Sequence, residues 1–117
     1  MHKLLPTLLL ALLPAMAESY YDRNGAYQGR TETDASGNTR FYDRSGAYQG
    51  RVQDGRFYDR NGAYQGRVQD GRYYDRNGAY QGRDDNGRFY DRSGAYQGRQ
   101  ENGRFYDKNG SYRGRKQ

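Results

Sequence analysis

The sequence predicts an all-β protein built from tandem antiparallel β-hairpin repeats, a meander that is either open or closed into a small barrel or flower-like ring. Three observations predict this class. One eleven-residue unit recurs six times, glycine is frequent from Gly25 onward, and aromatic residues flank paired turn signals. A glycine about every sixth residue disfavours helix, because each one costs about 1 kcal/mol in a helix interior. Short strands joined by tight turns are therefore expected.

The first 17 residues predict a secretory signal peptide. A short polar start precedes an apolar run over 4–13, and Ala15-Met16-Ala17 offers small residues at the positions that a signal peptidase recognises. The apolar run reaches only about 15 Å as a helix, so we expect cleavage after Ala17 and no transmembrane span afterwards. The mature chain, residues 18–117, is then a single domain in the periplasm or outside the cell.

The mature part of the chain lacks the residues of an ordinary core. All seven leucines, both prolines and both methionines lie in the first 16 residues. The remainder has 14 Tyr and four Phe, but only two valines, Val52 and Val68. So few aliphatic residues suggest disorder on composition alone. The regular spacing of the turns argues against disorder, and the aromatic side chains supply the apolar surface instead.

The repeating unit is aromatic-Tyr-Asp-Arg-(Asn/Ser)-Gly-Ala-Tyr-Gln-Gly-Arg, and the second to sixth copies start 16 residues apart. The first spacing is 21, because the connector 31–40 is five residues longer than the later ones. Each copy and its connector predict two strands, or about twelve in total. The copies are Tyr20–Arg30, Phe41–Arg51, Phe57–Arg67, Tyr73–Arg83, Phe89–Arg99 and, slightly altered, Phe105–Arg115.

The Asp-Arg-(Asn/Ser)-Gly segment predicts a three-residue loop in every copy, made of a type I turn followed by a left-handed glycine. A two-residue type I′ turn suits Asn-Gly, but it suits the Ser-Gly of copies two and five poorly. The aspartate opens the loop, where its carboxylate accepts hydrogen bonds from nearby backbone N–H groups. The predicted turn residues are Asp22, Gly25, Asp43, Gly46, Asp59, Gly62, Asp75, Gly78, Asp91, Gly94, Asp107 and Gly110.

This loop predicts the strand register. It pairs Tyr58 with Tyr64, and paired residues share a face of the sheet. The two loops of a unit must then match in parity, so we expect three-residue loops at Gln53-Asp54-Gly55 and its equivalents. The odd first spacing requires an even loop or a bulge around 34–37. The alternative has two-residue loops throughout and places Phe57, Tyr64 and Val68 on one face.

The segment Tyr58-Asp59-Arg60-Asn61-Gly62-Ala63-Tyr64-Gln65-Gly66-Arg67 resembles the repeat of small exported bacterial proteins of unassigned function that carry Tyr-Asp-x-x-Gly-x-x-x-Gly-Arg. It is also similar to the β-flower repeat families, in which short hairpins are arranged radially about a pseudo-symmetry axis. The resemblance covers residues 20–115 and implies hairpins in a ring. It implies no activity.

The composition argues against an enzyme. Residues 18–117 contain no His or Cys, and the six equivalent aspartates fall in turns. Near-identical carboxylates would not separate into an acid and a base. The Asp-x-Asn-Gly segment resembles the start of a calcium loop, but no bidentate glutamate follows at the required distance. We therefore predict no catalytic, metal-binding or cofactor-binding residues.

The charge pattern predicts an anionic partner. Without Lys3 the chain has 19 basic and 14 acidic residues, a net charge of +5, and the charges are interspersed. Repeated Gly-Arg and tyrosine would suit nucleic acid, but export and the aspartate in every unit argue against it. The candidate ligand-binding residues are Arg30, Arg51, Arg67, Arg83 and Arg99.

We therefore expect a non-enzymatic binding or interaction module of the bacterial envelope or the extracellular space. Its arginines would be offered to an anionic envelope polymer, a glycan or a protein, and repetition would build avidity from weak sites. The alternative is a structural subunit of an extracellular fibre or matrix. Self-association of in-register strands would form such a fibre.

Overall fold

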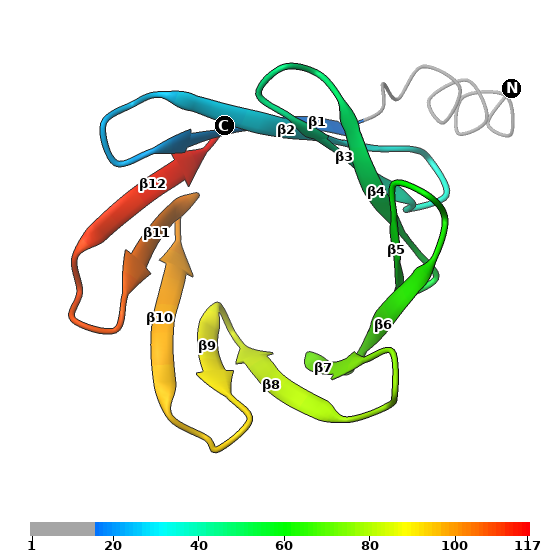
Figure 1. The fold of residues 1–117 in the computed structure, drawn as a ribbon. Coiled ribbons are helices and arrows are strands. Elements are labelled where there is room, and N and C mark those ends of the chain that lie inside the picture. The colour runs from blue at the N-terminus through cyan, green and yellow to red at the C-terminus, as the bar shows by residue number, and fades with distance from the viewer. Residues whose placement is uncertain (1–15) are drawn as a thin grey trace, which may run out of the picture.

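The computed structural model describes residues 16–117, which form an all-β fold as the sequence predicts. Twelve antiparallel strands follow one another in hairpins and close into a barrel (Figure 1). None of the described residues forms a helix with the length and hydropathy of a membrane span. The strands are β1 (Met16–Asp22), β2 (Tyr27–Thr33), β3 (Thr39–Asp43), β4 (Tyr48–Gln53), β5 (Arg56–Asp59), β6 (Tyr64–Gln69), β7 (Arg72–Asp75), β8 (Tyr80–Asp85), β9 (Arg88–Asp91), β10 (Tyr96–Glu101), β11 (Arg104–Asp107) and β12 (Tyr112–Lys116).

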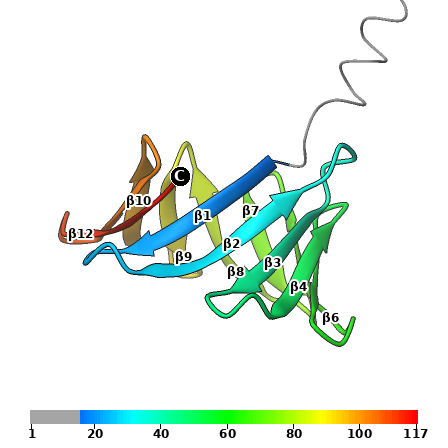
Figure 2. The same cartoon turned by 90° about the horizontal axis from the view of Figure 1, so that it is seen from above.

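The predicted signal peptide lies outside the described residues, except for Met16 and Ala17, which begin β1. The barrel closes where β1 pairs with β12 as well as with β2. Ser19 and Gln117 add two backbone hydrogen bonds of 2.8 Å beside this seam. In the view at right angles to that of Figure 1, β1, β2 and β3 run obliquely across the wall of the barrel (Figure 2). The twelve described strands therefore leave no free sheet edge.

The hairpin tips have the expected three-residue loop. In the third copy the N–H of Gly62 donates to the Asp59 carbonyl at 3.0 Å, and the N–H of Asp59 donates to the Ala63 carbonyl at 3.0 Å. Gly62 has a φ of 83°, the left-handed conformation that the type I turn with a glycine requires. Tyr58 pairs with Tyr64, as predicted.

The prediction of three-residue loops in the connectors is wrong. Gln53 pairs directly with Arg56, so the loop between them has only the two residues Asp54 and Gly55. Both have positive φ, 53° and 75°. Positive φ at both positions is the type I′ turn, and Asp-Gly and Asn-Gly are its favoured sequences. The same turn follows in the later connectors, where Asp70, Asn86 and Asn102 have φ values of 51° to 53°.

A β-bulge in every hairpin reconciles an odd tip loop with an even connector. Phe57 pairs with Gly66 but Tyr58 pairs with Tyr64, so Gln65 is an extra residue on β6. The same shift occurs in the other five hairpins. The parity argument failed because it allowed a bulge only at the long connector. The alternative with two-residue loops throughout is correct for the connectors and for the shared face of Phe57 and Val68. It is wrong for the hairpin tips, and Tyr64 lies on the face opposite to Phe57.

The long connector contains neither the even loop nor the bulge expected around 34–37. The N–H of Asp34 donates to the Asn38 carbonyl at 2.9 Å, and the N–H of Gly37 donates to the Asp34 carbonyl at 3.0 Å. This is the three-residue loop of the hairpin tips, and β2 and β3 pair without a register shift. Compared with the later connectors, the long connector has two more cross-strand residue pairs and one more loop residue, which together account for its five extra residues. The side chains of β3 therefore lie on the same faces of the sheet as those of the equivalent later strands.

The two faces of the wall carry different residues. The rings of Phe57 and Tyr73 have centroids 6.2 Å apart, although two strand spacings separate their backbones by about 9.6 Å. These rings therefore converge on the concave, interior face, where a cavity is lined by residues of β1 to β7. Tyr58, Tyr64 and Arg67 have the opposite parity and face outward.

The barrel has no conventional core. No hydrophobic side chain is buried among residues 17–117, and Thr31 is the one buried polar residue there. The other buried residues of this range are glycines of the wall, against which the next hairpin packs. They are Gly29, Gly50, Gly66, Gly82, Gly98 and Gly114.

Candidate functional site

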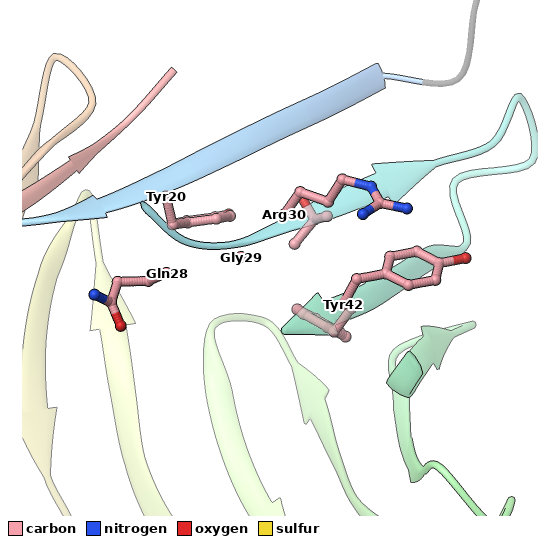
Figure 3. A pocket seen from close by; sticks show the side chains of 7 residues that line it. Tyr20, Gln28, Gly29, Arg30 and Tyr42 are labelled. Atoms are coloured by element: carbon pink, nitrogen blue, oxygen red, sulfur yellow. The ribbon is translucent and has the colours of Figure 1, made fainter. Parts of the chain in front are cut away.

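The five arginines predicted to bind a ligand occupy equivalent half-buried positions on the outer face, and Arg115 takes the sixth. Each guanidinium lies over a tyrosine ring of the next strand. The Cζ atom of Arg67 is 4.3 Å from the ring centroid of Tyr74. Figure 3 shows the corresponding pair Arg30 and Tyr42, on β2 and β3. The remaining pairs are Arg51–Tyr58, Arg83–Tyr90, Arg99–Tyr106 and Arg115–Tyr21.

Each stacked tyrosine also contacts the tyrosine paired with it across the hairpin. The rings of Tyr74 and Tyr80 meet edge to face, with centroids 5.9 Å apart and an interplanar angle of 61°. The other five copies repeat this arrangement. An Arg–Tyr–Tyr group therefore recurs around the whole outer wall. Aromatic contact of this kind contributes about 0.5–1.5 kcal/mol beyond the burial of area.

A second set of arginines, which the sequence analysis did not select, lies beside the first. Arg56 closes the connector and pairs directly with Arg67 across the hairpin. Paired positions bring the Cβ atoms within about 4.5–5.5 Å, and like charges so placed repel. We call these two sets together the arginine belt. Its cross-strand pairs are Arg40–Arg51, Arg56–Arg67, Arg72–Arg83, Arg88–Arg99 and Arg104–Arg115.

Neighbouring carboxylates offset the positive charge of the arginines at some positions of the belt only. The Nε of Arg30 donates to the Glu32 carboxylate at 3.1 Å, and this bond, with a smaller contribution from Tyr27, raises the pKa of Arg30. At the equivalent position of the next unit, the Nε of Arg51 donates at the same distance to the neutral amide oxygen of Gln53. The Arg51 guanidinium is held in place there without being neutralised.

Two of the arginine pairs line surface pockets. Arg104 and Arg115, with two tyrosines, line one of about 530 Å³. Arg88 and Arg99 help to line another, of about 270 Å³, where Glu101 already pairs with the Nε of Arg99 at 3.3 Å. A guanidinium stacked on a ring presents its N–H donors at the edge. Where Nε is already engaged, as in Arg30, Arg51 and Arg99, the two Nη atoms still offer donors that match the oxygens of a carboxylate, sulfate or phosphate. The belt is therefore suited to oxyanions.

The predicted turn aspartates serve their own loops. Asp59 Oδ1 accepts hydrogen bonds of 2.9 Å from the N–H groups of Asn61 and Ala63, and Oδ2 accepts one of 3.0 Å from the Gln65 side chain. The bond from Ala63 is the main cause that lowers the pKa of Asp59. Both oxygens are engaged in this way in the first five copies, so those carboxylates have little capacity left for a ligand. In the sixth copy Arg113 replaces the glutamine, and the loop engages Oδ1 of Asp107.

Among the described residues, no three His, Cys, Asp or Glu side chains gather to hold a metal ion. No family model, no curated protein and no solved structure matches the chain. The role of the arginine belt is therefore inferred from its own geometry.

Proposed function

We propose that the protein is a non-enzymatic binding module of the bacterial envelope or the extracellular space, and that its ligand is an acidic polysaccharide held by the arginine belt. The direct cross-strand pairing of arginines, such as Arg56 with Arg67, carries this proposal. Two like charges at paired positions oppose folding. An oxyanion between them replaces the repulsion with two charge-assisted hydrogen bonds.

The stacked tyrosines support the proposal because they prepare the arginines for binding. A free arginine side chain loses rotamer entropy when a ligand immobilises it, and this loss weakens binding. Arg67 already lies against the Tyr74 ring at 4.3 Å. The Arg–Tyr–Tyr groups recur every two strands, about 10 Å apart across the wall. A linear polymer with regularly spaced acidic groups can engage several of them at once.

Two features argue against a nucleic-acid partner and against the fibre alternative. Nucleic acid binding to single strands uses free aromatic faces for base stacking, but Arg67 covers one face of Tyr74 and Tyr80 meets the same ring at 5.9 Å. The fibre alternative requires strand edges, and the closed ring of described strands offers none.

The test compares dextran sulfate with uncharged dextran by isothermal titration calorimetry at rising salt concentrations. A belt variant and a loop variant lose the same number of positive charges, and only the first loses arginine pairs. We expect dextran sulfate alone to bind, the belt variant to bind about tenfold more weakly, and the loop variant to change little. The belt variant is Arg56→Gln, Arg67→Gln, Arg72→Gln and Arg83→Gln, and the loop variant is Arg44→Gln, Arg60→Gln, Arg76→Gln and Arg92→Gln.

Equal weakening of both variants would assign the binding to net charge and contradict the proposal. Tighter binding of single-stranded DNA than of dextran sulfate at the same salt concentration would indicate a nucleic-acid partner instead. An absence of binding to dextran sulfate at low salt would also count against the belt as an oxyanion site.

A further inference from the structure

The interior of the barrel is too wide for its own side chains to fill. Twelve strands spaced by about 4.8 Å and tilted by about 40° give a backbone diameter of about 24 Å. Side chains from two facing sheets fill a gap of only about 10 Å. The observed burial agrees, since no hydrophobic side chain is buried among residues 17–117. The lumen therefore has apolar surface that the chain itself leaves partly uncovered.

This lumen has an apolar half and a polar half. One interior position of each unit, two residues after the buried glycine, differs between the copies, and it decides the character of the wall. Valine pairs there with an aromatic residue of the next strand, as Val68 does with Tyr73. Later copies place polar residues at the same position. In chain order the six residues are Thr31, Val52, Val68, Asp84, Gln100 and Lys116.

A cavity of about 330 Å³ lies on the apolar half. Phe41, Phe57, Val52 and Val68 are among the residues that line it. This volume is at the lower end of the range for small-molecule sites, about 300–1,000 Å³.

Hydrogen-bonding groups lie at the border of this cavity. The hydroxyls of Thr33 and Thr39 are 2.9 Å apart, and each retains further bonding capacity. Glu18 also borders the cavity, but its carboxylate lies 3.4 Å from the ammonium of Lys116. The charge of Glu18 is thus offset, and the groups that remain favour a ligand with a neutral polar end.

We infer that the lumen binds a neutral, largely apolar small molecule with one hydrogen-bonding end, seated on the Val52–Val68 side. This site is separate from the arginine belt, which lies on the outer face. The aromatic rings provide flat contact surfaces, and burial of the uncovered wall by the ligand drives binding.

The probe for this site is N-phenyl-1-naphthylamine, a neutral aromatic dye that fluoresces in apolar surroundings. Because it has no charge, the arginine belt does not attract it. The repeats supply matched variants: Val52→Gln with Val68→Gln introduces the residue that the chain has at position 100. Asp84→Val with Gln100→Val extends the apolar wall instead.

We expect saturable binding of the dye to the purified protein, about tenfold weaker binding in the Val→Gln variant, and tighter binding in the variant with added valines. Arg56→Gln with Arg67→Gln, which alters only the outer face, leaves the affinity unchanged. Circular dichroism confirms that each variant is folded. If the Val→Gln variant unfolds, the added-valine variant decides the question.

Unchanged dye affinity in folded variants of both kinds would overturn the inference, as would the absence of saturable binding. Loss of dye binding on Arg56→Gln with Arg67→Gln would move the site to the outer face. Failure of the dextran sulfate experiment leaves the lumen site standing, because the two tests use different faces and different probes.

Discussion

The backbone of Gly66 lies against the carbonyl oxygen of Tyr74 on the neighbouring hairpin, so closely that a β-carbon on Gly66 would overlap this oxygen. The equivalent glycine of every other unit has the same contact, and Gly114 makes it with Tyr21 across the seam of the barrel. Neighbouring hairpins thus meet backbone to backbone at these points. The second glycine of each unit is a requirement of the barrel wall, whereas the first is a requirement of the tip loop.

This contact predicts that the two glycines of one unit differ in their tolerance of alanine. Gly62→Ala places a β-carbon in open space and costs about 1 kcal/mol for the left-handed conformation. Gly66→Ala adds the overlap with Tyr74 to an unfavourable φ of 144° and costs about 3 kcal/mol or more. Urea unfolding measures both free energies of unfolding. Equal costs would show that the hairpins do not pack as closely as the structure indicates.

The tip loops predict a loss of stability in acid. Hydrogen bonds lower the pKa of Asp43, and the bond from the Ser45 hydroxyl, 2.7 Å long, is the largest cause. A carboxyl whose folded pKa is depressed stabilises the protein above its unfolded pKa of about 3.9, and this contribution disappears as the pH falls through the folded pKa. Below pH 4 the free energy of unfolding should therefore decrease.

Ser45→Ala tests this expectation, because it removes the largest cause of the lowered pKa of Asp43. The variant should be less stable at pH 7 and should lose less stability between pH 5 and pH 2 than the parent protein. Ser36→Ala is the control, since Ser36 bonds Asp34 through its backbone N–H. Urea unfolding across this pH range gives the slopes. A Ser45→Ala slope equal to that of the parent would contradict the proposed role of the hydroxyl.

The tip loops could be predicted because every determinant lies within five consecutive residues. Asp59 opens the turn, Gly62 supplies the left-handed conformation, and Tyr58 and Tyr64 then pair. The connectors could not be predicted by parity, because the bulge at Gln65 adds a residue to one strand. No local pattern in the sequence marks the bulge. Gly66 follows Gln65 directly, but the need for glycine at this position comes from the contact with the neighbouring hairpin.

The arrangement of the candidate site could be predicted only in part, because it too depends on the register beyond the bulge. Arg67 is prominent as a repeated position, but its pairing with Arg56 depends on the register beyond the bulge. Its stacking on Tyr74 depends on the connector, which determines where the next strand begins. Closure of the ring depends on the curvature accumulated over all the strands, and no local sequence pattern indicates this closure.

The arginine pairs predict an unusual response of stability to mutation. Arg56→Gln removes one of two facing charges and leaves the stack of Arg67 on Tyr74 intact. The variant should therefore be more stable than the parent by about 0.5 kcal/mol at low ionic strength, while it binds dextran sulfate more weakly. Added salt should reduce the difference, because it screens exposed charges.

Arg60→Gln, in the tip loop, is the control for Arg56→Gln and removes the same charge without an arginine opposite. Urea unfolding at two salt concentrations gives the free energies of unfolding. If Arg56→Gln destabilises the protein, or if Arg60→Gln stabilises it equally, repulsion between Arg56 and Arg67 is not the cause.

Closure of the barrel predicts how the protein behaves when one strand is lost. Deletion of residues 112–117 removes β12, the partner of both β1 and β11, and exposes two strand edges. Such edges pair with other chains. The truncated protein should therefore form oligomers whose size increases with concentration, and analytical ultracentrifugation should show the parent protein as a monomer under the same conditions.

A circular permutant separates the effect of closure from that of an altered chain end. Ser19 and Gln117 exchange two backbone hydrogen bonds of 2.8 Å, so a short flexible linker can join them while the chain is opened between Ala35 and Ser36 in the long connector. The linker replaces the start of β1, so the pairs of Met16, Ala17 and Glu18 with β2 are lost. All the other strand pairs survive this change, because the opening lies in an exposed loop. The permutant should sediment as a monomer. A truncated protein that also remains monomeric, with an unchanged melting temperature, would show that pairing of β1 with β12 does not hold the barrel together.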